Sequence, residues 1–283
     1  MLIAQRSDPG GGAVPAPMHE RPVATSAVDV RSRLVRYLCW FLFALLATPA
    51  AAQSPEISVD TAVIELAGAA QSVDIYRRVV GASRGVAIVA HGFTRSRSRH
   101  SDLGRALAEA GVVAVIPDLP SVLDLWANGD AIAQLVQKLE AGAFGLVPVA
   151  RSRVVLIGTS AGGLATVLAA ANVPGIAGWI GLDPVDRTGT GVGAAEKLTS
   201  PAVVLLAEAS GCNLFGSGRR IARAVPRLVR TNVIEGATHC DFESPTNHFC
   251  RVMCGGASDQ LQEVIRRETV TATLELLPDS AIH

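Results

Sequence analysis

The chain has 283 residues, of which 49% are hydrophobic and 18% are charged. This composition excludes a disordered protein, because the chain can bury enough apolar surface to offset the entropy lost on ordering. The 25 basic and 25 acidic side chains cancel, which argues against nucleic acid as a partner. The basic residues are nearly all arginine, and we interpret the arginine-rich stretches at 95–99 and 219–230 as a compositional bias.

The first 52 residues predict an export signal. Residues 1–30 are rich in Gly, Pro and Ala without periodicity, and we interpret them as a disordered or misassigned extension. Residues 31–52 have the order of a secretory signal peptide: arginines, an apolar stretch, then a small-residue cleavage site. The apolar stretch is shorter than the about 20 residues that span a bilayer, so we expect no membrane span after cleavage. We therefore expect residues 53–283 to form one periplasmic or secreted domain.

Within that domain, short β-branched runs alternate with Ala- and Leu-rich windows. Two opening strands are predicted at 57–66 and 72–80, followed by apolar strands at 85–90, 112–116, 153–157, 176–182, 201–207 and 229–234. Helices are predicted at 101–110, 130–139 and 161–171, with a terminal helix within 258–277. Continuous apolar strands separated by helices predict an α/β fold with a mostly parallel sheet that is covered on both faces.

Chemistry in such a sheet lies at the carboxyl ends of the strands. The motif G-T-S-A-G at 158–162 directly follows one predicted strand and precedes a helix. This is the arrangement of a nucleophile elbow, in which Ser160 sits on a sharp turn and the flanking glycines let neighbouring backbone approach. We therefore expect Ser160 to be a nucleophile.

A second motif, H-G-F at 91–93, follows the first predicted parallel strand. In nucleophile-elbow enzymes the oxyanion donors are the N–H of the residue after the serine and an N–H of this earlier loop. Ala161 and Phe93 are the candidates. We interpret His91 as a structural residue beside that loop and not as a catalytic base.

The base and the acid are expected after later strands, in the chain order Ser, acid, His. His239 follows the last predicted strand and is favoured as the base over His248. Asp183 ends a strand and is favoured as the acid that orients the imidazole. Glu208 and Asp186 stay open as alternative acids.

Four cysteines lie in the expected mature chain: Cys212, Cys240, Cys250 and Cys254. An even number in an exported protein predicts two disulfides. Cys250 and Cys254 can share a helical turn, which is a poor disulfide geometry, so we expect Cys212 to pair with one of these two or with Cys240. The alternative is a zinc site made by Cys240, His248, Cys250 and Cys254.

The motifs H-G-F, G-T-S-A-G, G-L-D-P-V-D at 181–186 and a late T-H together resemble the α/β-hydrolase superfamily. Within it, the chain resembles the chlorophyllase and bacterial cutinase-like polyester-hydrolase branch over roughly residues 70–270. The resemblance implies that Asp183 is the triad acid. It differs in that Thr159 and Ala161 stand where chlorophyllases have His and Arg, which argues against chlorophyll as the substrate.

These features predict an exported serine hydrolase that cleaves a small, lipid or polyester carboxylic ester through Ser160, Asp183 and His239. No metal or organic cofactor is expected. Two other classes remain as alternatives: a non-catalytic binding domain of the same fold, and a zinc-dependent hydrolase built on the C-terminal Cys/His cluster.

Overall fold

The computed structural model describes residues 54–280. The interpretations of residues 1–30 as an extension and of 31–52 as a signal peptide lie outside the described residues. In the part of the chain that is described, no helix combines the length and the apolar character needed to cross a membrane.

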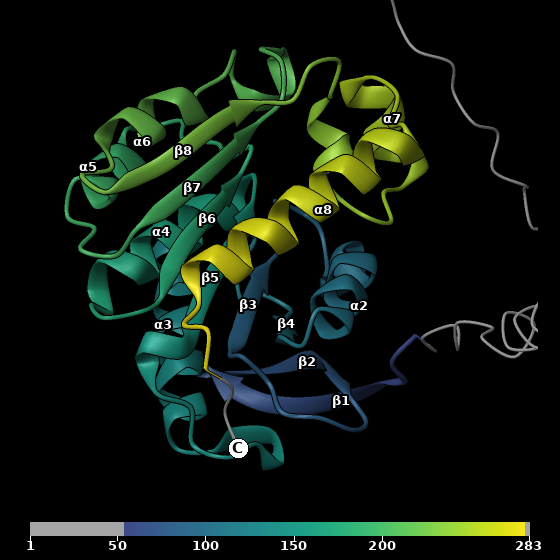
Figure 1. Ribbon diagram of the computed structural model, residues 1–283. Helices are drawn as coiled ribbons and strands as arrows, with labels where there is room; N and C mark the ends of the chain where they lie inside the picture. The colour runs from purple at the N-terminus through teal and green to yellow at the C-terminus, as the bar shows by residue number, and fades with distance from the viewer. Residues whose placement is uncertain (1–53, 281–283) are drawn as a thin grey trace, which may run out of the picture. The chain divides into compact units, whose positions relative to one another are not determined.

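The described chain is built around an eight-stranded mixed sheet in the order β1-β2-β4-β3-β5-β6-β7-β8 (Figure 1). The pairs β1/β2 and β2/β4 are antiparallel, and all other neighbours are parallel. The strands are β1 Ile57–Leu66, β2 Ala69–Arg78, β3 Val86–Ala90, β4 Val113–Pro117, β5 Val154–Thr159, β6 Gly178–Leu182, β7 Ala202–Leu206 and β8 Leu228–Val233.

Helices cover both faces of the sheet because the central strands are apolar on both faces. Residues of α3, α4, α5 and α6 share one buried cluster, and α2 and α8 share the other. In Figure 1, α8 runs across the near face of the sheet. The helices are α2 Ser101–Glu109, α3 Leu125–Glu140, α4 Ala161–Asn172, α5 Thr190–Ala195, α6 Gly218–Ala224, α7 His248–Cys254 and α8 Asp259–Leu276.

This architecture confirms the predicted α/β class with a mostly parallel sheet, and it is compatible with an α/β-hydrolase fold. The eight predicted strands all form. The largest difference among the predicted helices is at the start of α3, which begins five residues before the predicted helix. Asp124 explains this start, because its carboxylate accepts hydrogen bonds from the Trp126 and Ala127 N–H groups and caps the helix.

Candidate active site

Ser160 lies on a sharp turn between β5 and α4, with φ 57° and ψ −122°. This conformation is strained for a residue with a side chain, so the surroundings must hold it. A Cβ on Gly158 would meet the Gly162 carbonyl oxygen at 2.2 Å, and a Cβ on Gly162 would meet the Ala90 oxygen at 2.4 Å. Both glycines are therefore required by close backbone approach, as the motif predicts.

Three side chains from different strand ends form one hydrogen-bonded chain. The Ser160 Oγ lies 2.9 Å from Nε2 of His239, and Nδ1 of His239 lies 2.6 Å from Oδ2 of Asp183. Ser160 follows β5, Asp183 follows β6, and His239 follows β8 in the 3₁₀ turn His239–Phe242. The three sequence-predicted residues thus come together although Ser160 and His239 are separated by 79 positions.

Asp183 is 1% exposed, so its charge depends on hydrogen bonds from the protein. The Ala207 N–H donates to its Oδ1 at 3.1 Å, and the Asn213 side-chain amide donates to its Oδ2 at 3.2 Å. These two hydrogen bonds hold the Asp183 carboxylate in place against the His239 imidazole. Asn213 is not predicted from the sequence, because a single Asn in a loop belongs to no recognisable pattern.

The other two candidate acids do not contact His239. The exposed Glu208 side chain accepts a hydrogen bond from the Gly236 N–H at 3.0 Å. Asp186 is fully buried, and its carboxylate accepts hydrogen bonds from the N–H groups of Thr188, Gly189 and Val192. Asp186 therefore organises the loop that leads into α5, and Asp183 alone of the three carboxylates lies against the imidazole.

The two other histidines considered above have different surroundings. His91 is buried; its Nδ1 bonds to the Gly92 carbonyl, and its Nε2 accepts from the Leu119 N–H. Burial lowers the pKa of His91, so the imidazole stays neutral in this structural role. His248 is exposed at the first residue of α7.

The two predicted oxyanion donors flank Ser160. Ala161 is the first residue of α4, and Phe93 lies in the loop after β3. A Cβ on Gly92 would lie 3.2 Å from the Ser160 Cβ, so this loop packs directly against the nucleophile. Among the backbone hydrogen bonds in the described turns, loops and helix caps, none has the N–H of Phe93 or of Ala161 as its donor. A small cavity lined by Phe93, Leu119 and Ala161, among others, lies beside them.

A larger hollow lies elsewhere, at the amino-terminal ends of β3 and β4, and is lined by Val86, Val113 and residues of the β2–β3 connection. It contains no serine paired with a histidine. The hydrogen-bonded chain of Ser160, His239 and Asp183 lies instead at the carboxyl edge of the sheet, which makes that edge the candidate site.

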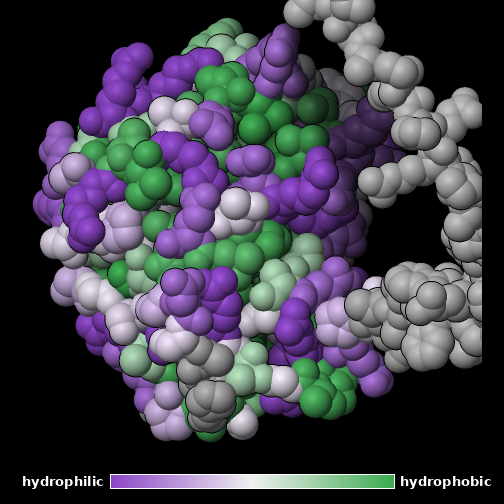
Figure 2. Space-filling model, in the orientation of Figure 1, coloured by the Kyte–Doolittle hydropathy of each residue, from purple (hydrophilic) through white to green (hydrophobic). Residues whose placement is uncertain are grey.

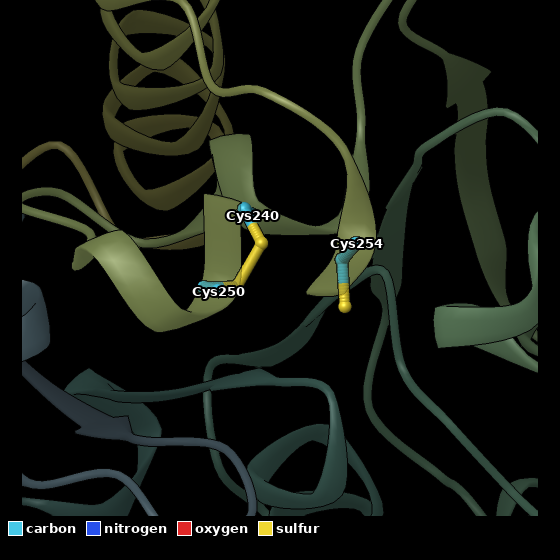
Figure 3. Close-up of side chains that lie close together, drawn as sticks. All are labelled: Cys240, Cys250 and Cys254. Atoms are coloured by element: carbon cyan, nitrogen blue, oxygen red, sulfur yellow. A yellow bond between two sulfur atoms is a disulfide. The ribbon is translucent and has the colours of Figure 1, made fainter. Parts of the chain in front are cut away.

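The four cysteines form two disulfides, Cys212–Cys254 and Cys240–Cys250. The prediction of two disulfides is confirmed, and Cys212 pairs with one of the partners expected for it. Figure 3 shows the Cys240–Cys250 bond with Cys254 beside it. The sulfurs of these three residues lie within 4.8 Å of one another, but each is bonded to another sulfur. A zinc site needs thiolates, so the disulfides argue against the Cys/His alternative.

No protein-family model matches the chain, and a search of curated proteins finds no match either. The fold and the contacts around Ser160 are therefore the basis on which a function is inferred.

Proposed function

We propose that this protein is an exported serine hydrolase that cleaves carboxylic esters, in a branch of the α/β hydrolases that resembles chlorophyllases and bacterial cutinase-like polyester hydrolases. The observation that carries the proposal is the pair of contacts at His239, 2.9 Å to the Ser160 hydroxyl and 2.6 Å to the Asp183 carboxylate. A nucleophile, a base and an orienting acid within hydrogen-bond distance are the parts that acyl transfer requires.

The mechanism follows from these contacts. Ser160 attacks the ester carbonyl while His239 takes its proton, and Asp183 stabilises the imidazolium that forms. The N–H groups of Phe93 and Ala161 stabilise the oxyanion of the tetrahedral intermediate. His239 then gives the proton to the leaving alkoxide. Water, activated by His239, hydrolyses the acyl-enzyme and restores the free serine.

Exposed apolar side chains at the carboxyl edge of the sheet favour a hydrophobic ester. They lie on the loops and helices that follow four strands: Phe93, Val122, Leu123, Trp126, Phe215, Phe249, Val252 and Met253. Figure 2 shows hydrophobic side chains gathered near the top of that view, where β7 and β8 end in Figure 1. Contact with an apolar acyl or alcohol group would remove this surface from water.

Export is supported by the signal-peptide pattern and by the two disulfides, since disulfides persist in oxidising compartments. Expression of the full chain in a bacterial host with a Sec pathway tests this part. We expect the protein in the periplasm or medium with a new N-terminus near Gln53, as read by mass spectrometry. An unprocessed chain in the cytoplasm would contradict it.

Serine-directed labelling tests the chemistry. We expect a fluorophosphonate probe to label the protein and p-nitrophenyl esters to be hydrolysed, with both activities lost in Ser160→Ala and kept in the matched variant Ser98→Ala at an exposed position. Unlabelled, inactive wild-type protein would favour a non-catalytic binding domain. Activity that survives Ser160→Ala but is lost with a chelator would favour a metal-dependent hydrolase.

A further inference from the structure

The loop that carries Phe93 is held by a buried ion pair that the serine, histidine and acid do not explain. Arg95 Nε lies 2.9 Å from Oε1 of Glu243, and their side chains are only 11% and 6% exposed. The Arg95 guanidinium also donates through Nη1 to the Asn247 side-chain oxygen at 3.2 Å. One side chain thus binds two residues of the segment that follows His239.

The two partners belong to the two loops that must meet for catalysis. Arg95 closes a tight turn in which its N–H donates to the Gly92 carbonyl at 3.2 Å, so Phe93 and Thr94 are the central residues. Glu243 lies four positions after His239, directly after the 3₁₀ turn that begins with it. The contact therefore connects the oxyanion loop to the loop of the base.

The turn at Phe93 needs an external restraint. Thr94 has φ 54°, a conformation that is unfavourable for a β-branched side chain. Such strain persists only where surrounding contacts fix the backbone. Arg95 is the next residue, and its buried pairing with Glu243 and Asn247 supplies such contacts.

Arg95 and Glu243 each depend on the other, because both side chains are charged and buried. Burial raises the pKa of Glu243 above its ordinary value, and the charge of Arg95 opposes part of that shift. Either partner without the other would be an uncompensated charge in a dry site, which is a costly arrangement. Apolar residues of similar volume could fill the same space without that cost. Stability alone therefore does not account for a buried charged pair at this position.

We propose that Arg95 and Glu243 are positioning residues that fix the Phe93 N–H relative to the Ser160–His239 pair. This proposal rests on the proposed ester hydrolysis. Neither residue is assigned a step in bond making or breaking. The pair acts through the placement of an oxyanion donor, so its removal should lower kcat and leave KM nearly unchanged, because oxyanion donors stabilise the transition state more than the bound substrate.

The decisive variant is the double substitution Arg95→Met/Glu243→Leu. Because it leaves no unpaired charge, we expect it to fold with an unfolding temperature within a few degrees of wild type. We expect its kcat for a p-nitrophenyl ester to fall about 10- to 100-fold, less than the loss of a whole oxyanion donor, with KM changed less than about threefold. Glu243→Gln leaves the Arg95 guanidinium without its carboxylate partner, so this variant should have both a lower stability and a lower kcat.

The matched control is the distant pair between Arg151 and Glu140, whose nitrogen and oxygen lie 2.8 Å apart. Arg151→Met/Glu140→Leu should leave kcat at the wild-type value. A merely structural role for Arg95 and Glu243 predicts the same result for both double variants. The proposal is overturned if the folded Arg95→Met/Glu243→Leu protein keeps kcat within twofold of wild type.

Amide hydrogen exchange provides a readout that does not need turnover. In Arg95→Met/Glu243→Leu we expect faster exchange in peptides covering 91–95 and 239–247, with the core strands unchanged. If wild-type protein shows no Ser160-dependent hydrolysis, the proposed function fails on its own. The exchange data then decide whether the ion pair holds the two loops together, and unchanged exchange in both peptides refutes that idea.

Discussion

The Cys212–Cys254 disulfide should be a large contributor to stability, and its effect can be estimated from the structure. It closes a segment with a sequence separation of 42 residues, and both cysteines are only half-buried. Little packing is therefore lost in Cys212→Ala/Cys254→Ala, and the main effect is the greater entropy of the unfolded chain. The chain-entropy relation gives about 4 kcal/mol of unfolding free energy for a loop of this length.

The assay is urea denaturation at pH 7 and 25 °C, with calorimetry alongside. For a domain of this size, 4 kcal/mol corresponds to an unfolding temperature about 8 to 16 °C lower. The comparison is Cys240→Ala/Cys250→Ala, whose separation of 10 residues gives about 2.7 kcal/mol from entropy, plus the packing of two buried sulfurs. A loss below about 1 kcal/mol for the longer loop would refute the entropic reasoning.

Three further predictions concern individual side chains. Asp183→Asn should lower kcat about 10⁴-fold, because it favours the wrong tautomer of the His239 imidazole. Glu208→Gln should keep kcat within a few fold of wild type. Equal losses of kcat in steady-state assays would contradict the assignment of Asp183 as the acid. Asn213→Ala removes a fully buried side-chain amide that forms hydrogen bonds with four residues, Asp183, Glu208, Ser210 and Gly216. We expect the free energy of unfolding measured in urea to fall by about 3 kcal/mol and kcat to fall as well, and an unchanged urea midpoint would count against this prediction. Burial, with a smaller contribution from nearby His91, lowers the pKa of His100 from 6.5 to about 3. Below pH 6.5 the unfolded chain therefore binds a proton that the folded chain excludes. The free energy of unfolding should fall by about 1.4 kcal/mol for each pH unit below that point. His100→Leu should reduce that acid sensitivity between pH 6.5 and 5, and an identical slope would show that other groups cause it.

Much of the fold could be predicted because its signals are local. The strands β3, β4 and β7 are continuous apolar runs, and their burial follows directly from that composition. The short helices α5, α6 and α7 are not predicted from the sequence, because six or seven residues show too little apolar periodicity to distinguish a helix from a loop.

Local sequence patterns mark some residues of the candidate site and not others. Ser160 was found from its glycines, and His239 and Asp183 from their places after strands. The sequence places Arg95 in an arginine-rich stretch that we interpret as a compositional bias, but its side chain is buried against Glu243. No local pattern distinguishes such an arginine from an exposed one, because its partner lies nearly 150 positions away.

The sequence by itself determined the class of fold, the turn at Ser160 and the number of disulfides, because each depends on residue type and spacing within a short stretch. Only the tertiary structure decided which carboxylate faces His239, which cysteines pair, and which buried polar groups hold the two loops together. Those choices depend on distances between strand ends and loops, and the order of strands in the sheet sets these distances, whereas position along the chain does not.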